Sequence, residues 1–144
     1  ARRGRRPRGW LGPWISQSAR TPDLLREAGY DYLLDWAHDD QPTKFITTPT
    51  TAPSTSEPTV TTILSIPYQQ ELNDIPHAMA RLGGSREFAD DLVDGFDELL
   101  AQSVQQPLVL GVALHPYIVG QPHRLRQLRR ALQHIKREAD TTDR

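Results

Sequence analysis

Apolar and polar positions along the chain follow two periods, which predict helices alternating with strands. Thr21 is suited to cap a helix, Pro22 to begin its first turn and Gly29 to end it. The segment Tyr30–Trp36 then has the aromatic and apolar content of a strand. A helix that leads directly into a strand is half of a βαβ unit.

The second half of the chain continues this alternation. Ile63–Tyr68 predicts a strand, and Ser85 is suited to cap an amphipathic helix that runs to about Ser103. Leu108–Leu114 is almost wholly apolar, which is typical of a parallel strand covered on both faces. Pro122 opens a last helix with leucines inward and arginines outward. The order of elements predicts an α/β fold.

Three segments fall outside this pattern. Residues 43–62 hold nine threonines, three prolines and two serines, and this composition predicts a solvated loop. Residues 1–9 contain five arginines and predict a disordered arm, while residues 140–144 predict a tail. The folded domain is therefore expected to span residues 10–139.

Composition excludes several classes of protein. The chain of 144 residues suggests one domain at most, and the absence of cysteine excludes disulfides and thiolate metal sites. No segment has the apolar length of a membrane helix, and the Arg-rich start is not followed by the apolar stretch of a signal peptide. We therefore expect no membrane partner and a cytoplasmic location. Because the first residue is Ala1 rather than Met, we also expect that the natural protein is longer or processed.

His115 is the sharpest candidate for chemistry. It follows the predicted strand Leu108–Leu114, and loops at the carboxyl ends of parallel strands form active sites in α/β folds. A histidine there can exchange a proton near neutral pH. The alternative interpretation is a structural histidine that is hydrogen-bonded to the backbone.

A second cluster contains Asp35, Asp39 and Asp40, again directly after a predicted strand. These carboxylates could orient an arginine, tune a base or bind a metal, or they could simply form a polar loop. Arg6 and Arg8 could pair with them in bidentate fashion, or they could belong to a solvated tail.

Other site types are not supported by the sequence. The five histidines show no short metal-ligand spacing, so the residues predict no self-contained zinc site. No phosphate-binding glycine loop and no nucleophile turn occur. The last helix has a basic face, but no stacking aromatic residues accompany it, so nucleic acid is not the expected partner.

Three segments carry a family resemblance: RPRGWLGPWISQSARTPDLLREAGYDYLLDWAHDDQP, ILSIPYQQELNDIP and LVLGVALHPYIVGQPHRLRQLRRAL. They resemble the polysaccharide deacetylase family (NodB-like, carbohydrate esterase family 4), and within it the branch of allantoinase-like enzymes. The resemblance covers most of the chain outside residues 43–62 and the two ends. Because the family folds as a distorted (β/α) barrel, the resemblance implies an α/β fold that forms the C-terminal half of such a barrel.

The resemblance also implies roles for individual residues. His115 matches the late histidine motif and would be the general acid that protonates the leaving amine. Arg6 resembles the arginine that orients the catalytic base, although Arg8 is a competing match. The acidic residues Asp35 and Asp40 would support the site. Trp10 and Trp14 would line the substrate groove.

The family hydrolyses N-acetyl groups or related amides with a divalent metal such as zinc, although some allantoinase-like members need none. Its early aspartate pair and its His-x-x-x-His motif, which supply the base and the metal ligands, have no equivalent in this chain. The implied function is therefore a C–N hydrolase of N-acetylated saccharides or small amides that is incomplete and inactive as this chain. Two alternatives are a non-catalytic remnant that binds glycan or protein, including as a homo-oligomer, and an arginine-driven nucleic-acid binder.

Overall fold

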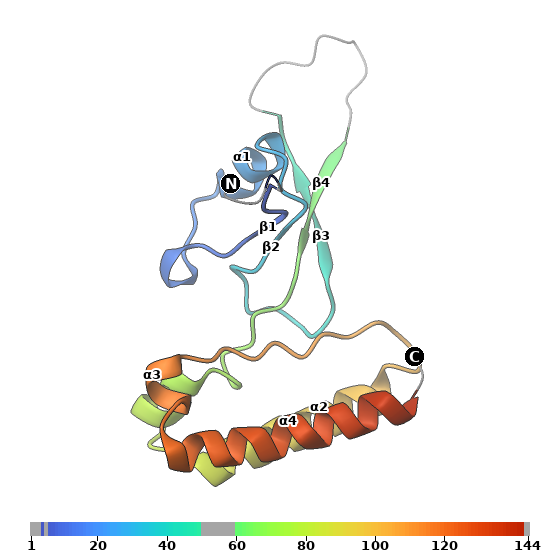
Figure 1. Cartoon of the computed structure of the whole chain (residues 1–144). Coiled ribbons are helices and arrows are strands. Elements are labelled where there is room, and N and C mark those ends of the chain that lie inside the picture. The colour runs from blue at the N-terminus through green and yellow to red at the C-terminus, as the bar shows by residue number, and fades with distance from the viewer. Residues whose placement is uncertain (1–3, 5, 50–59, 143–144) are drawn as a thin grey trace. The chain divides into compact units, whose positions relative to one another are not determined.

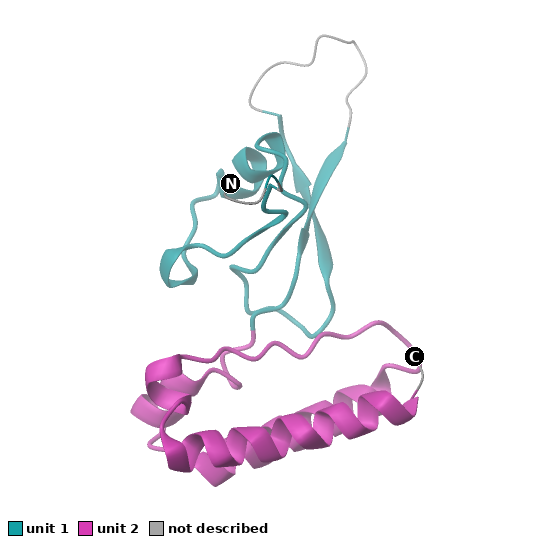
Figure 2. Ribbon diagram, viewed as in Figure 1, with its two compact units in different colours: residues 1–68 teal, residues 69–144 magenta. Residues whose placement is uncertain are grey.

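The computed structural model describes residues 4, 6–49 and 60–142 of the chain. The chain divides into two compact units, residues 1–68 and residues 69–144, which Figure 2 shows in different colours. Each unit is described here by itself. Within the described ranges, no helix combines the length and the apolar character that crossing a lipid bilayer requires.

The first unit is built on a four-stranded sheet with one helix and one short helical turn (Figure 1). Its elements are β1 (Gly9–Trp10), the turn Pro13–Ile15, α1 (Thr21–Glu27), β2 (Tyr32–Leu33), β3 (Thr43–Thr47) and β4 (Thr61–Ser65). The strand order is β1-β2-β4-β3. Strands β1, β2 and β4 are parallel, whereas β3 is antiparallel to β4.

A small apolar core holds this sheet against α1. Leu25 of α1, Leu33 of β2 and Ile63 of β4 are buried together, with exposed fractions between 0% and 7%. Trp10, Tyr30 and Phe45 pack around them. Gly29 follows α1 with φ +81°, a conformation that glycine adopts without steric cost, so the predicted end of this helix is confirmed.

The second unit contains two long parallel helices. Its elements are the helical turn η2 (Pro76–Ala80), α2 (Ser85–Gln102), α3 (Pro116–Val119) and α4 (Pro122–Thr142). Figure 1 shows α2 and α4 side by side. Asp90 of α2 pairs with Arg130 of α4, and the later Asp97 pairs with the later His134, so the two helices run in the same direction. Their shared core contains the following buried residues: Leu72, Phe88, Ala89, Leu92, Val119, Leu128 and Ala131.

The prediction of a regular strand at Leu108–Leu114 is wrong. Its one backbone pairing within the described part of the chain is a parallel bridge between Asn73 and Ala113. The side-chain amide of Gln69 makes hydrogen bonds that a neighbouring strand would otherwise make. It donates to the Val109 carbonyl at 3.0 Å and accepts from the Gly111 N–H. The segment is therefore extended but is held largely by a side chain.

The structure also corrects several predicted boundaries. Residues 43–47 and 61–62 are not loop, because β3 and β4 pair there, with Thr47 opposite Thr61; residues 50–59 lie outside the described part. The strand predicted at Tyr30–Trp36 shortens to two residues. Capping falls one residue earlier than predicted, at Arg20 for α1 and Gly84 for α2.

Both predicted ends are more ordered than the composition suggested. Residues 140–142 continue α4 and so are not a tail, while residues 143–144 lie outside the described part. Gly9 of the predicted disordered arm belongs to β1. The carbonyl of Arg8 accepts a hydrogen bond from the Asp31 N–H at 2.8 Å, so this part of the arm is docked on the sheet unit. Residues 1–3 and 5 lie outside the described part.

Candidate functional site

Polar groups gather at the carboxyl edge of the parallel strands in the sheet unit. Asp35 follows β2 and is buried, with 7% of its surface exposed. Its Oδ1 accepts a hydrogen bond from the backbone N–H of Gly12 at 2.5 Å. A Cβ at position 12 would lie 3.1 Å from the Asp35 carboxylate and 2.5 Å from the Ser16 carbonyl, so only glycine permits this close approach.

Gln17 completes the surroundings of Asp35. When its amide is oriented to satisfy both neighbours, the nitrogen donates to Asp35 Oδ2 at 3.2 Å and the oxygen accepts from Trp36 Nε1 at 2.6 Å. The Asp35 carboxylate is therefore bound by a backbone amide and a neutral side chain. Among the described residues, neither Arg6 nor Arg8 forms an ion pair with Asp35, which corrects the interpretation that one of them pairs with this carboxylate.

His38 joins the ends of two neighbouring strands at the same edge. Its Nε2 lies 2.9 Å from the hydroxyl of Ser65, the last residue of β4. Ser65 is fully buried, and its hydroxyl therefore cannot reach a substrate as a nucleophile. Phe45 packs beside the histidine ring at 6.2 Å between ring centroids. This pair holds the strand ends together and places His38, half-buried, at the edge.

Both candidate arginines contact the segment that follows α1. The Arg6 guanidinium donates to the Ala28 carbonyl, where it stabilises the carboxyl end of the helix. Arg8 Nε donates to Asp31 Oδ2 at 2.5 Å, and this hydrogen bond together with the carboxylate charge raises the pKa of Arg8 above its ordinary value. A raised pKa keeps the Arg8 guanidinium positively charged throughout the ordinary pH range. The role of Arg6 in orienting a base stays a prediction.

The two tryptophans have different surroundings. Trp10 is partly buried and makes an edge contact with Tyr30 at 5.7 Å between ring centroids, so it is part of the core of the sheet unit. Trp14 is 97% exposed and has φ 55°, an uncommon backbone conformation for a bulky residue. The predicted role of both residues in lining a groove stays a prediction.

Asp40 is half-buried in the loop after β2. Its backbone N–H donates to the Asp39 carboxylate at 2.8 Å, which fixes the turn between β2 and β3. Asp35, His38 and Asp40 thus come from one loop, which is held by one local hydrogen bond, at Asp40, and by two bonds to distant parts of the chain, at Gly12 and Ser65. The supporting role predicted for Asp35 and Asp40 stays a prediction.

In the second unit, His115 lies against a buried carboxylate. Its Nδ1 is 2.6 Å from Asp74 Oδ1, and its backbone N–H donates to Asp74 Oδ2 at 2.8 Å. The Asp74 side chain is 2% exposed, whereas the His115 side chain is 33% exposed. The adjacent bridge between Asn73 and Ala113 places the two residues next to each other, although 41 positions separate them in sequence.

This arrangement defines what the imidazole can do. A carboxylate only accepts hydrogen bonds, so it holds the proton on Nδ1 and leaves Nε2 as the atom that exchanges protons. When Nε2 also carries a proton, the negative charge of Asp74 offsets the positive ring. Tyr117 packs edge-on against the ring at 5.7 Å between centroids. His115 is therefore a partly exposed imidazole that Asp74 orients, and whether its role is catalytic or structural stays a prediction.

Asp74 is a site residue that the sequence reasoning missed. No periodic pattern marks the segment around it, which follows the predicted strand Ile63–Tyr68. The sequence offers one indication of its importance: Asp74 is an acidic residue next to Asn73 in a segment that carries the family resemblance. Only the pairing of Asn73 with Ala113 shows that this acid faces the histidine.

The described residues do not fit a metal centre. Within residues 4, 6–49 and 60–142, no group of three or more histidine, aspartate or glutamate side chains lies close enough to hold a metal ion. The buried His77 illustrates why: its Nε2 lies 3.1 Å from the Gly84 carbonyl, and its Nδ1 lies 3.7 Å from the Asp91 carboxylate. His77 thus secures the start of α2 rather than contributing to a ligand set.

Several solved structures are similar to this chain, among them two hydrolase-like proteins. The crystal structure of Puue allantoinase matches 92% of this chain with a TM-score of 0.70 and 29% sequence identity. The crystal structure of a probable polysaccharide deacetylase from Pseudomonas aeruginosa PAO1 matches 91% of this chain with a TM-score of 0.69 and 30% identity. No protein-family model and no curated protein sequence matches the chain.

These structures confirm the resemblance and the fold class predicted from the sequence. The chain has a mixed α/β fold and is similar to part of a NodB-type barrel, since it covers 41% of the length of each of the two structures. A hydrolase fold of the deacetylase type is thereby supported. Because the chain spans less than half of either structure, the fold alone does not assign an activity.

Proposed function

We propose that this chain is the part of a polysaccharide deacetylase-like C–N hydrolase that supplies the general acid. The observation that carries the proposal is the pairing of His115 with the buried Asp74, at 2.6 Å between Nδ1 and Oδ1. The similarity to an allantoinase and to a probable polysaccharide deacetylase supports the reaction class.

His115 would act on the leaving group. Hydrolysis of an amide releases an amine, which leaves readily only when its nitrogen takes up a proton. The half-exposed ring offers Nε2 for this transfer, while Asp74 binds both Nδ1 and the backbone N–H of the same residue and so fixes the direction of the ring.

The other half of the chemistry is not assigned to this chain. A divalent metal such as zinc would activate water and polarise the carbonyl where one is used, but the described residues do not form a site for it. We therefore propose that the base and any metal ligands lie outside these 144 residues and that the chain alone does not turn over substrate.

The proposed substrate is an N-acetylated saccharide or a related small amide. The supporting roles of Arg6, Asp35 and Asp40 and the substrate contacts of Trp10 and Trp14 stay predictions. A cytoplasmic location, the absence of a nucleic-acid partner and self-association into a homo-oligomer stay predictions.

The test begins with the natural protein. An antibody against α4 isolates it from its source cells, and its mass is compared with 16.3 kDa, the mass of this chain. The isolated protein is then assayed for acetate release from chitooligosaccharides and for opening of allantoin, with and without a chelator. We expect a larger product with activity that a His115→Gln substitution lowers on the order of a hundredfold.

A larger product that is inactive on both substrates would refute the proposed reaction class. A product of 16.3 kDa that hydrolyses either substrate would refute the proposal that the chain is incomplete.

A second candidate function is glycan binding without turnover. Trp14, which is 97% exposed, favours this function because exposed aromatic rings provide stacking faces for sugars. A product of 16.3 kDa that binds chitooligosaccharides without releasing acetate, and that loses binding on Trp14→Ala substitution, would establish it.

A further inference from the structure

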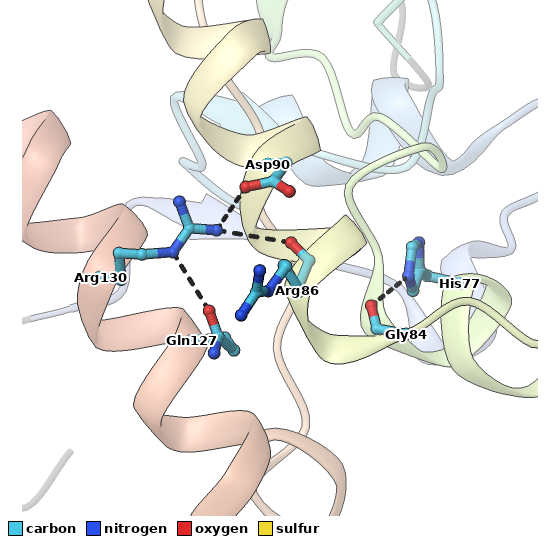
Figure 3. Close-up of polar contacts among 6 residues, drawn as sticks. All are labelled: His77, Gly84, Arg86, Asp90, Gln127 and Arg130. Atoms are coloured by element: carbon cyan, nitrogen blue, oxygen red, sulfur yellow. Dashed lines mark hydrogen bonds and ion pairs between the residues drawn. The ribbon is translucent and has the colours of Figure 1, made fainter.

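A groove between α2 and α4 gathers three guanidinium groups, and His115 is not among the residues that line it. It has a volume of about 380 Å³ and is lined by Arg86, Asp90, Arg126, Gln127 and Arg130. Figure 3 shows Arg130 reaching from α4 toward α2, while the side chain of Arg86 points back toward Gln127. The groove thus receives cationic groups from both helices.

Arg130 is held in place by three contacts. Its Nη2 donates to Asp90 Oδ1 at 2.5 Å and to the Arg86 carbonyl at 3.5 Å, and its Nε donates to Gln127 Oε1 at 3.1 Å (Figure 3). These contacts fix the plane of the guanidinium group. Arg130 therefore forms a preorganised wall of the groove, so binding would cost little further side-chain entropy there.

The other two arginines are not neutralised. Within the described ranges, the guanidinium groups of Arg86 and Arg126 make no hydrogen bond and no ion pair, and both residues are exposed. Three arginines and one aspartate give the lining a net charge of +2 (three minus one). Arg86 also lies in the first turn of α2, where a cation is unfavourable until an anion offsets it.

We propose that this groove binds a small dianionic phosphate group. Guanidinium groups present paired N–H donors that match phosphate oxygens, and the charge of +2 balances a phosphate monoester at neutral pH. The negative charge of Asp90, which would repel the ligand, is offset by its contact with Arg130. An extended polyanion fits less well, because this carboxylate interrupts the basic surface inside the groove. The proposal does not depend on hydrolase activity.

The experiment titrates inorganic phosphate into the 144-residue chain by isothermal calorimetry and by amide NMR, at pH 7.5 and constant ionic strength set with chloride. The variants are Arg86→Gln and Arg126→Gln. Arg129→Gln is the matched control, because it removes the same charge from an exposed position on α4 that does not line the groove. Arg130 is left intact because it links the two helices, and circular dichroism confirms that each variant retains its helices.

We expect saturable binding with a dissociation constant of about 1 mM or lower. Amide shifts should concentrate around Arg86 and Arg126, each groove variant should weaken binding on the order of tenfold, and Arg129→Gln should leave it unchanged. Absence of saturable binding would overturn the proposal. Equal weakening by all three variants would also overturn it, because it would indicate a diffuse basic surface.

Discussion

Asp74→Asn tests whether the buried carboxylate holds His115 in one state. The carboxylate accepts two hydrogen bonds from this residue, one from its backbone N–H at 2.8 Å and one from Nδ1 at 2.6 Å. Asparagine has nearly the same shape but only one oxygen, and its amide nitrogen donates. One of the two donors of His115 therefore faces another donor.

The neutral imidazole can relieve this conflict by moving its proton from Nδ1 to Nε2, so that Nδ1 accepts from the new amide. A hydrogen bond to a charged group contributes roughly 1.5–3 kcal/mol, and water can replace part of it because the His115 side chain is 33% exposed. We expect Asp74→Asn to lower the free energy of unfolding by about 1–2 kcal/mol. Asp74→Ala should lower it by about 2–4 kcal/mol, since both donors then lose their acceptor.

Two measurements check these values. Urea unfolding followed by circular dichroism at 222 nm reports the helical unit, and ¹⁵N NMR of the imidazole reports the tautomer of His115. Asp90→Asn is the matched control, because the ion pair of Asp90 with Arg130 is about half exposed on both sides. This substitution should cost no more than about 1 kcal/mol.

The reasoning would be refuted by an Asp74→Asn variant that keeps both the wild-type stability and the Nδ1–H tautomer. A tautomer change with unaltered stability would show that solvent replaces the lost bond completely. The predicted loss of stability would then be wrong, whereas the predicted change of tautomer would be confirmed.

Two further predictions concern the packing of the second unit. Leu92→Ala removes a fully buried side chain and should lower the free energy of unfolding by roughly 2–5 kcal/mol. Leu132→Ala is the control and should lower it distinctly less, because this position is 46% exposed. Comparable losses in urea unfolding would contradict the assigned core. Gly83→Ala would place a Cβ 2.2 Å from Nε2 of the buried His77 and should cost about 1–3 kcal/mol, measured in the same way. Gly84→Ala is its control, since nothing lies within 4 Å of that position, and an equal loss there would contradict the packing argument.

Periodic patterns predicted the long helices well because their signal is local. α2 runs from Ser85 to Gln102, within a residue of the prediction, and α4 begins at Pro122 as expected. Each helix satisfies its own backbone hydrogen bonds, so its apolar stripe is enough to define it. The end of α1 at Gly29 was predicted equally well, because the positive φ at this position is a local property of the chain.

Strand predictions failed where the partner decided the outcome. The apolar run Leu108–Leu114 predicted a central strand, but a strand needs a neighbouring backbone, and Gln69 supplies side-chain bonds instead. Conversely, Thr43–Thr47 was predicted as loop from its polar composition and became β3, because β4 offers a complete antiparallel register. Composition contains no information on such partners.

The sequence by itself determined the α/β class, the positions of the long helices and His115 as a proton-transfer candidate, because these depend on local spacing and residue chemistry. Only the tertiary structure brought Asp74 against His115 and assembled Arg86, Arg126 and Arg130 around one groove. Both arrangements join residues about 40 positions apart, such as Asp90 with Arg130. Their proximity follows from chain pairing and helix packing, which no local pattern specifies.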